Sequence, residues 1–439
     1  MFKHPRSSRL AGLLAALLAA GTALVLAGCG SDDSKSTDTT TPAVTTPVPK
    51  TIQSIKHVFV ITLENENYAT TFAANSKAPY LSKTLVSQGA HLQQYFGTTH
   101  VSLGNYIAMI SGQSVTADTQ MDCMVYKDFA LSGMGDHGQA IGTGCVYPAS
   151  VKTLPDQLKA ANLTWRGYME DMGNDPSRES ATCGHPALNT TDGTQSAQAA
   201  TAGGLPADQY ATRHNPFMYF HSIVDSPDCA TNVVNLTKLT DDLKSVATTP
   251  NFTFITPNLC NDGHDGGSAS SKCVNGDPGG LESADAFLQK WVPLIMASPA
   301  YQQDGLIIIN FDESSYATQV LDTSTTPPSL TMTFSGNTCC GQQAGPNVPA
   351  SSFPVSQSFP ASVSHYPYDI KLVTQSYGGD RTGAVLLSPF IKPGTVSTTA
   401  YNHYAMLKTL EDIFGIKEYL GYAGQEGLVP FGTDIFTNL

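Results

Sequence analysis

Three apolar runs along the chain end directly in carboxylate or amide side chains. The runs are Val58 to Leu63, Phe252 to Leu259 and Leu306 to Phe311. Short runs of this kind, rich in β-branched residues, are typical of buried strands. Apolar positions with helical spacing precede the second and third runs, at Leu239 to Val246 and Leu281 to Ala297. This alternation predicts an α/β fold with a mostly parallel central sheet and helices on both faces.

The polar residues that follow these runs are candidates for one shared site. They are Glu64, Asn65, Asp262, His264, Asp265, Asp312 and Glu313. In open α/β sheets, ligand-binding groups gather beyond the carboxyl ends of the strands. A single Asp or Asn at such a place could equally be a turn residue or a helix cap. Several carboxylates at one sheet edge repel one another unless a cation neutralises them, so we expect Glu64 and Asn65 to be oxygen ligands of a divalent metal ion.

Two further residues stand at the beginning of predicted helices. Ser102 lies at or near the start of a helix indicated by Ile107 and Ile110. A hydroxyl there meets free backbone N–H groups and the positive end of the helix dipole, which favour an alkoxide and an incoming phosphate. His403 precedes an apolar stripe near the C-terminus. Local sequence leaves both assignments open, because Ser is a common N-cap and most histidines are structural.

The N-terminal segment has the features of a bacterial lipoprotein leader. Basic residues precede an apolar run from Leu10 to Ala27, which ends in LAGC at Cys29. We expect cleavage before Cys29 and attachment to the membrane through a lipid on its thiol. An uncleaved membrane helix is the alternative, but the run is short and lacks a basic flank. Gly30, in place of Asp, indicates outer-membrane sorting, so we expect an exported protein in the periplasm or on the cell surface.

The chain is therefore expected to have three parts. They are a signal peptide (1–28), a tether rich in Ser, Thr and Pro (29–52) and one large domain (53–439). The formal net charge is −13, and removal of the three basic residues in the leader makes it −16. A chain this acidic is not expected to bind nucleic acid.

Eight cysteines remain after Cys29, and behind an export signal they are expected to form disulfides rather than a metal cluster. We expect Cys260 to pair with Cys273, because the spacing is short and the intervening loop has no apolar anchors. Cys339 and Cys340 are adjacent. Since one peptide step is shorter than the usual Cα separation in a disulfide, we expect each of them to have a distant partner.

Six motifs, taken together, resemble those of one enzyme family. They are LEN at 63–65, THxSxxNYIAxxSG at 99–112, HNPF at 214–217, PNLCNDGHD at 257–265, DE at 312–313 and NHYxxLKTLED at 402–412. In this order they are similar to the phosphoesterase family of bacterial and fungal acid phosphatases and phospholipases C, within the alkaline-phosphatase superfamily. The resemblance covers nearly the whole chain after the tether and implies an alkaline-phosphatase-like fold.

The resemblance also implies a role for each matching residue. Ser102 would be the nucleophile that becomes phosphorylated, and Asn105 would donate to a phosphoryl oxygen. His264 and His403 would bind phosphate, shuttle protons or take part in metal binding, while His214 would bind substrate at the pocket wall. The implied metal ligands are Glu64, Asn65, Asp312 and Glu313. Val101 and Gly104 replace prolines that are common in the family, and Asn402 replaces its usual acid.

The expected activity is that of an acid phosphatase acting on a phosphorylated small molecule or a lipid headgroup through a phosphoserine intermediate. Four oxygen ligands suit Mg²⁺, Ca²⁺ or Mn²⁺, and the histidines could favour Zn²⁺. Activity is expected to be highest below neutrality, where His264 and His403 would be cationic. The alternatives are a phospholipase C acting on choline phospholipids, which would favour an aromatic cage, and a non-catalytic surface binding lipoprotein.

Overall fold

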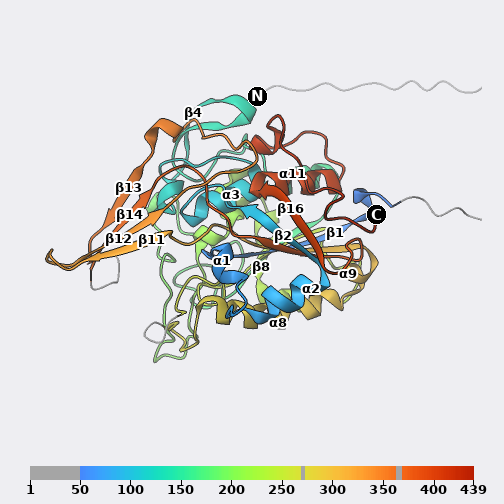
Figure 1. Ribbon diagram of the computed structural model, residues 1–439, viewed down its shortest axis with the longest axis horizontal. Helices are drawn as coiled ribbons and strands as arrows, with labels where there is room; N and C mark the ends of the chain where they lie inside the picture. The colour runs from blue at the N-terminus through green and yellow to red at the C-terminus, as the bar shows by residue number, and fades with distance from the viewer. Residues whose placement is uncertain (1–49, 268–271, 362–367) are drawn as a thin grey trace, which may run out of the picture. The chain divides into compact units, whose positions relative to one another are not determined.

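The centre of the fold is an eight-stranded sheet (Figure 1). The computed structural model describes residues 50–267, 272–361 and 368–439. In spatial order the strands are β16 (Thr395–Asn402), β2 (Ala90–Phe96), β15 (Ala384–Leu387), β10 (Gly305–Phe311), β1 (His57–Leu63), β9 (Phe252–Thr256), β6 (Trp165–Met169) and β8 (Val233–Asn235). Neighbouring strands are parallel except where β15 pairs with β10 and β2. The predicted α/β fold with a mostly parallel central sheet is confirmed.

Alternate residues of the central strands face two separate hydrophobic clusters. In β1, Val58 and Val60 belong to one cluster, whereas Phe59 and Ile61 belong to the other. The first cluster includes α3 (Ser102–Ser111) and α11 (His403–Ile413), and the second includes α8 (Gly280–Met296). Helices therefore cover both faces of the sheet. Because neither face meets water, the strands are apolar at successive positions, which explains the continuous runs in the sequence.

Two of the expected elements are shorter than the apolar pattern predicted. Strand β9 ends at Thr256, because Pro257 has no N–H to continue the ladder. The helix expected at 239–246 is one turn, α7 (Leu239–Asp242). The hydroxyls of Thr248 and Thr249 donate to the carbonyl oxygen of Asp242 at 2.9 Å. A longer helix would need this oxygen as an acceptor for one of its own N–H groups.

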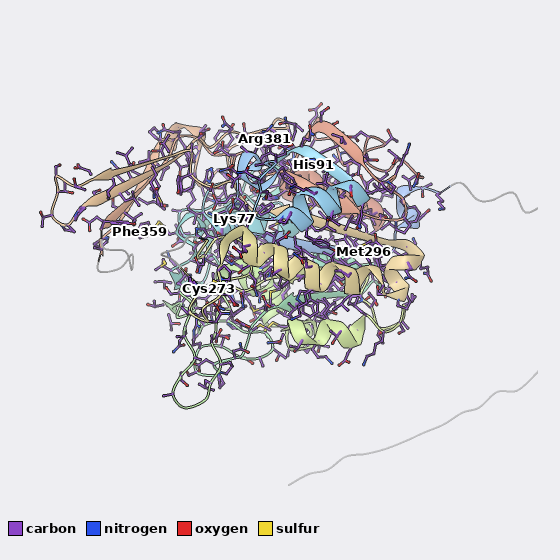
Figure 2. All side chains as sticks on the ribbon, turned by 60° about the horizontal axis from the view of Figure 1, so that its bottom comes forward. Lys77, His91, Cys273, Met296, Phe359 and Arg381 are labelled. Atoms are coloured by element: carbon purple, nitrogen blue, oxygen red, sulfur yellow. A yellow bond between two sulfur atoms is a disulfide. The ribbon has the colours of Figure 1, made fainter. Side chains whose placement is uncertain are left out.

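A second sheet of four strands lies at the left of Figure 1. Its strands, in spatial order, are β11 (Thr318–Asp322), β12 (Ser329–Phe334), β14 (Asp369–Thr374) and β13 (Val355–Phe359). In Figure 2, Phe359 marks this sheet and Met296 marks the end of α8, well apart in the view. The long insertion between β10 and β15 thus forms a small sheet of its own, which the search for apolar runs did not predict.

Shorter elements fill the remaining connections. They are α1 (Tyr68–Thr71), α2 (Val86–Gln88), α4 (Leu154–Ala160), α5 (His221–Val224), α6 (Asp228–Asn232) and α9 (Pro299–Asp304), with the strand pairs β3 (Val125–Tyr126) with β7 (Thr190–Thr191) and β4 (Ala130–Met134) with β5 (Ala140–Thr143). Within the described ranges, no helix has the length and apolar character needed to cross a membrane. The predicted signal peptide and all but the last residues of the predicted tether lie outside the described residues.

All eight cysteines that the sequence analysis assigned to disulfides are paired. The pairs are Cys123–Cys145, Cys183–Cys229, Cys260–Cys273 and Cys339–Cys340. The predicted bridge between Cys260 and Cys273 is confirmed. The expectation of distant partners for Cys339 and Cys340 is wrong. The other six cysteines pair among themselves, and Cys340 adopts a left-handed backbone conformation (φ 63°) in a turn that brings the two neighbouring thiols together.

Candidate active site

The three predicted strand ends meet at one edge of the central sheet. Leu63 of β1 pairs with Phe311 of β10, so Glu64 and Asp312 follow neighbouring residues. The Asp312 N–H donates to the Leu63 carbonyl at 2.8 Å, and the Glu64 N–H donates to the Asp262 carbonyl at 2.8 Å. These backbone bonds continue the ladder past the strands. They place three carboxylates, all without solvent exposure, around one point.

Ser102 is the first residue of α3 and faces this group of carboxylates. Its Oγ donates a hydrogen bond to Glu64 Oε2 at 2.8 Å. The preceding residue, Val101, has φ 78°, a conformation that a β-branched residue adopts only when its surroundings impose it. The Val101 N–H donates to Glu313 Oε1 at 2.9 Å, which stabilises the turn. The sharp turn therefore presents the Ser102 hydroxyl at the helix start, the position that the sequence predicted, while its role as a nucleophile stays a prediction.

Three oxygens beside Ser102 are buried and have no hydrogen-bond donor. They are Glu64 Oε1, Asn65 Oδ1 and Asp312 Oδ2. Burial, and then the neighbouring charge of Asp312, raise the pKa of Glu64 well above its usual range. Burial and then Glu313 do the same to the pKa of Asp312. Among the described residues no group of three or more His, Cys, Asp and Glu is already arranged to hold a metal. Carboxylate and amide oxygens that are buried without a donor nevertheless fit a hard divalent cation in their chemistry, because a cation can supply the positive charge that they lack.

Glu313, the fourth predicted ligand, has both oxygens engaged. Oε1 accepts from Val101, and Oε2 contacts Nδ1 of His100. His100 Nε2 lies 2.8 Å from Asp380 Oδ2. Burial would lower the pKa of His100, but Glu313 and Asp380 outweigh that effect and raise it to about 9, so the imidazole is cationic. In this structure Glu313 supports the turn before Ser102. The sequence analysis gave no role to His100, although it stands two residues before Ser102.

His214 lies beneath the site, almost fully buried. Its Nε2 is 3.3 Å from Glu64 Oε1, and its Nδ1 is 3.6 Å from Asp262 Oδ2. The ring stacks on Tyr106 with centroids 5.2 Å apart. Burial, and then the nearby charge of Arg213, lower the pKa of His214 well below its usual range, so the imidazole is neutral. His214 therefore contacts Glu64 from within the protein, whereas the resemblance implied that it would bind substrate at the wall of the pocket.

The two histidines predicted to bind phosphate have different surroundings. His264 is half exposed and lines the same cavity as Ser102. His403 is fully buried; its Nδ1 lies 2.9 Å from the Tyr95 hydroxyl and its Nε2 lies 2.5 Å from the Asp312 carbonyl oxygen. Burial lowers the pKa of His403 to about 4. The expectation that His403 is cationic in mild acid is therefore wrong, and its contacts fix the end of β10.

Asn105 also uses its side chain within the protein. Its Oδ1 accepts from the N–H groups of Thr98 and Thr99 at 2.9 and 3.1 Å, and its Nδ2 donates to the Thr99 carbonyl at 3.0 Å. Its amide therefore shapes the loop that leads to Ser102. The hydrogen bond to the Thr99 carbonyl uses one of the two N–H donors of the amide, and donation to a phosphoryl oxygen, the role that the resemblance implied, stays a prediction.

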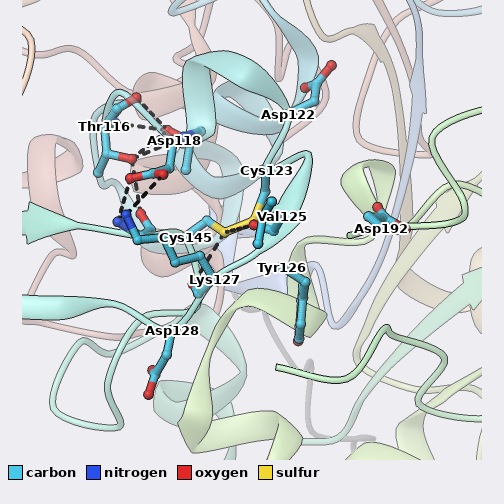
Figure 3. The surroundings of a disulfide bond; sticks show 12 residues. Thr116, Asp118, Asp122, Cys123, Val125, Tyr126, Lys127, Asp128, Cys145 and Asp192 are labelled. Atoms are coloured by element: carbon cyan, nitrogen blue, oxygen red, sulfur yellow. Dashed lines mark hydrogen bonds and ion pairs between the residues drawn. A yellow bond between two sulfur atoms is a disulfide. The ribbon is translucent and has the colours of Figure 1, made fainter. Parts of the chain in front are cut away.

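A cavity of about 260 Å³ opens beside Ser102. Its polar lining includes His264 and two residues that the sequence analysis missed, Arg213 and Asp122. Arg213 Nη1 donates to the Gln195 carbonyl at 2.9 Å, and its Nε lies 3.7 Å from Asp122 Oδ2. Figure 3 shows Asp122 next to the Cys123–Cys145 disulfide, which anchors its loop. Arg213 directly precedes the HNPF motif, and that position was the signal available in the sequence.

Comparison with known proteins shows which family the chain belongs to. The family model described as Phosphoesterase family matches residues 72–417. Over 261 residues the chain is 23% identical to a probable acid phosphatase of Kluyveromyces lactis, covering 60% of this chain and 48% of that protein. Over 233 residues it is 27% identical to a phosphate-repressible acid phosphatase of Penicillium chrysogenum, covering 53% and 43%. The chain thus spans about half the length of the curated relatives it matches.

Among solved structures, a protein in the alkaline phosphatase superfamily from Vibrio parahaemolyticus is 11% identical, with a TM-score of 0.45, and the match covers 87% of this chain and 72% of that one. A likeness this weak carries no argument about activity. The family model covers most of the chain, and its match confirms the resemblance that the six motifs indicated. The chain belongs to the phosphoesterase family.

Proposed function

We propose that this chain is an exported, lipid-anchored phosphomonoesterase of the acid-phosphatase type that acts through a phosphoserine intermediate at Ser102. The observation that carries the proposal is the hydrogen bond from Ser102 Oγ to Glu64 Oε2 beside three unpaired buried oxygens. A hydroxyl with a carboxylate acceptor at a helix start is suited to attack phosphorus. The acid phosphatases among its relatives support the same activity.

Binding of the substrate would begin with its charge. Arg213 and His264 line the cavity and can donate to the non-bridging phosphoryl oxygens. The α3 N-terminus adds a positive field at the same place. These groups would hold the phosphorus in front of Ser102 Oγ, with the alcohol oxygen on the opposite side. Positioning of this kind supplies much of the rate in phosphoryl transfer.

In the first step, Ser102 Oγ would form a bond to phosphorus while the bond from phosphorus to the alcohol oxygen breaks. The Ser102 proton passes to Glu64, which already accepts its hydrogen bond. His264, at the rim of the cavity, is placed to give a proton to the departing alcohol. In the second step, the oxygen of a water molecule bonds to phosphorus while the water gives a proton to His264, the bond from phosphorus to Ser102 Oγ breaks, and the proton returns from Glu64 to the serine.

The residues that would hold a divalent cation are Glu64, Asn65 and Asp312, through their unpaired oxygens. Mg²⁺, Ca²⁺, Mn²⁺ or Zn²⁺ bound there would supply positive charge for the phosphoryl oxygens and would favour ionisation of the serine hydroxyl. Burial and the neighbouring carboxylates raise the pKa of Glu64 and of Asp312, so the charged forms of both are disfavoured, and a cation would offset that cost.

Phospholipase C activity on choline phospholipids is less well supported. A choline headgroup favours a cage of aromatic side chains, tryptophan above all. Both tryptophans, Trp165 and Trp291, are packed in the two hydrophobic clusters rather than along the cavity. A purely binding protein would have no need of a serine hydrogen-bonded to a buried carboxylate at the start of a helix.

The test compares p-nitrophenyl phosphate with p-nitrophenylphosphorylcholine for the wild type and for Ser102→Ala, each with and without a chelator. We expect the wild type to hydrolyse the monoester, the chelator to abolish that activity, and added divalent metal to restore it. Ser102→Ala should be inactive in every condition. Cleavage of the choline diester alone would instead favour the phospholipase, and no turnover of either ester would favour the binding protein.

A further inference from the structure

The lining of the cavity beside Ser102 includes both polar residues and a group of apolar residues. The polar wall includes Arg213, Asp122 and His264. The apolar wall comes from the small sheet and consists of Met332, Phe334, Ile370 and Leu372, and Tyr316 also lines the cavity. Two chemically different surfaces therefore meet at the nucleophile, as they would for a ligand with a charged and an apolar end.

The strand register explains how the wall forms. In the parallel pair of β12 and β14, Leu330 lies beside Ile370 and Met332 lies beside Leu372. Because side chains alternate between the two faces of a sheet, the apolar residues of both strands share one face. The residues between them, Thr331, Thr333 and Lys371, lie on the other face. The pattern SLTMTF in β12 thus gives the small sheet one apolar face, and that face lines the cavity.

This apolar face is not part of the main core. Leu330, Phe334 and Ile370 are buried, with exposed fractions of 4%, 8% and 6%, yet neither hydrophobic cluster of the central sheet includes them. The wall is nevertheless fixed next to the nucleophile, because the Phe334 ring packs on His100 with centroids 4.4 Å apart. Met332 and Leu372 are only partly buried and line the cavity, so the wall keeps apolar surface that a ligand can contact.

We propose that this wall binds the alcohol part of the substrate, and that the preferred substrates are phosphate monoesters of apolar alkyl or aryl alcohols. The inference rests on the proposed function. Arg213 and His264 bind the phosphate while the carbon skeleton packs on Met332, Phe334, Ile370 and Leu372. A sugar in the same place would bury hydroxyl groups against side chains that cannot hydrogen-bond to them, which is unfavourable.

Hydrolysis of ethyl, butyl and hexyl phosphate, followed by release of inorganic phosphate, tests this proposal. The alcohols differ little in acidity, so differences in kcat/KM report binding of the chain rather than the leaving group's reactivity. Each methylene that becomes fully buried is expected to raise kcat/KM roughly fourfold. Because the cavity is partly open, we expect hexyl phosphate to exceed ethyl phosphate by at least about tenfold.

Three variants localise the effect. Met332→Gln and Leu372→Asn place amides on the apolar wall with little change in size, and each should reduce the hexyl-to-ethyl ratio by at least about fivefold. Val373→Thr is the matched control, because Val373 adjoins Leu372 in β14 but lies on the opposite face. It should keep both the ratio and the rate with ethyl phosphate. Circular dichroism of each variant checks that the fold is retained.

The outcomes separate this inference from the proposed function. Turnover of ethyl phosphate with a hexyl-to-ethyl ratio near one would overturn the apolar subsite and leave the phosphatase standing. If no ester is hydrolysed, the proposed function fails, and calorimetry with ethylphosphonate and hexylphosphonate still decides about the wall. Tighter binding of the hexyl compound, lost in Met332→Gln, supports the wall, whereas equal binding of the two compounds refutes it.

Discussion

Val101 offers a sharp test of how the nucleophile is presented. Its φ of 78° costs about 1–3 kcal/mol for a residue other than glycine. Val101→Gly removes that strain. Against this gain, glycine loses about 0.5–1 kcal/mol through backbone entropy, and the loss of a half-buried isopropyl group costs roughly 0.7 kcal/mol, about half of full burial. The free energy of unfolding should therefore change by between about −0.7 and +1.8 kcal/mol, a range that lies mostly on the side of increased stability.

Activity should respond differently from stability. In the proposed mechanism, the Val101 N–H and its restricted backbone would hold Ser102 in line with a bound phosphate. A more flexible turn should lower kcat about ten- to hundredfold, because small displacements of a nucleophile are costly. Urea unfolding and steady-state kinetics with phenyl phosphate measure the two effects.

Val355→Gly is the control for this experiment. Val355 is equally half-buried but lies in strand β13 and has no positive φ. Without strain to relieve, its replacement should destabilise the protein by roughly 1–2 kcal/mol. If Val101→Gly destabilises as much as this control, or keeps full kcat, the turn before Ser102 is neither strained nor important for positioning.

Three other predictions concern charge. Glu64→Gln and Asp312→Asn should each weaken divalent-metal binding at least about tenfold in equilibrium dialysis, because a carboxylate with an unpaired oxygen becomes an amide. Glu411→Gln, which changes a buried carboxyl elsewhere, is the control. If the Glu64 and Asp312 variants bind as much metal as the wild type, these two residues are not ligands. Arg213→Met should reduce kcat/KM about ten- to hundredfold and weaken inhibition by inorganic phosphate, since it removes charge-assisted hydrogen bonds; an unchanged inhibition constant would place Arg213 outside the phosphate site. Burial raises the pKa of Glu411 to about 8. Between about pH 5 and pH 8 the folded protein therefore keeps a proton that the unfolded chain has lost, and each unit of rising pH should lower the free energy of unfolding by up to about 1.4 kcal/mol. Urea unfolding of Glu411→Gln should lack this part of the pH dependence, and identical pH profiles for the two proteins would contradict the buried, protonated state.

The sequence predicted the central sheet well because its strands are buried on both faces. Continuous apolar runs leave little doubt about position, and the rule that parallel strands end at one edge brought Glu64 close to Asp312. Ser102 was located by the start of α3, since helix periodicity is visible along the chain. The positions of the strands and of the start of α3 follow from the local apolar pattern, and the meeting of Glu64 with Asp312 follows from the shared edge at which parallel strands end.

What the sequence could not predict depends on tertiary packing. The start of α11 was located correctly, but the direction of the His403 ring toward Tyr95 and the Asp312 carbonyl is set by the strands beneath it. Arg213 and Asp122 lie about ninety positions apart in the sequence and meet only because separate loops cover the cavity. The apolar face of the small sheet alternates as SLTMTF, a pattern that shows a half-buried strand without showing what it faces.

The central claim is that Ser102 becomes phosphorylated during turnover, and trapping the intermediate tests it most directly. Wild-type protein loaded with divalent metal is mixed with phenyl phosphate and quenched in acid within the first turnover, and its peptides are mapped by mass spectrometry. We expect one phosphate on the peptide that contains Ser102, at the serine itself, and none in Ser102→Ala or in a sample mixed with phenol alone. Phosphate on a different side chain, or full turnover by Ser102→Ala, would contradict this account.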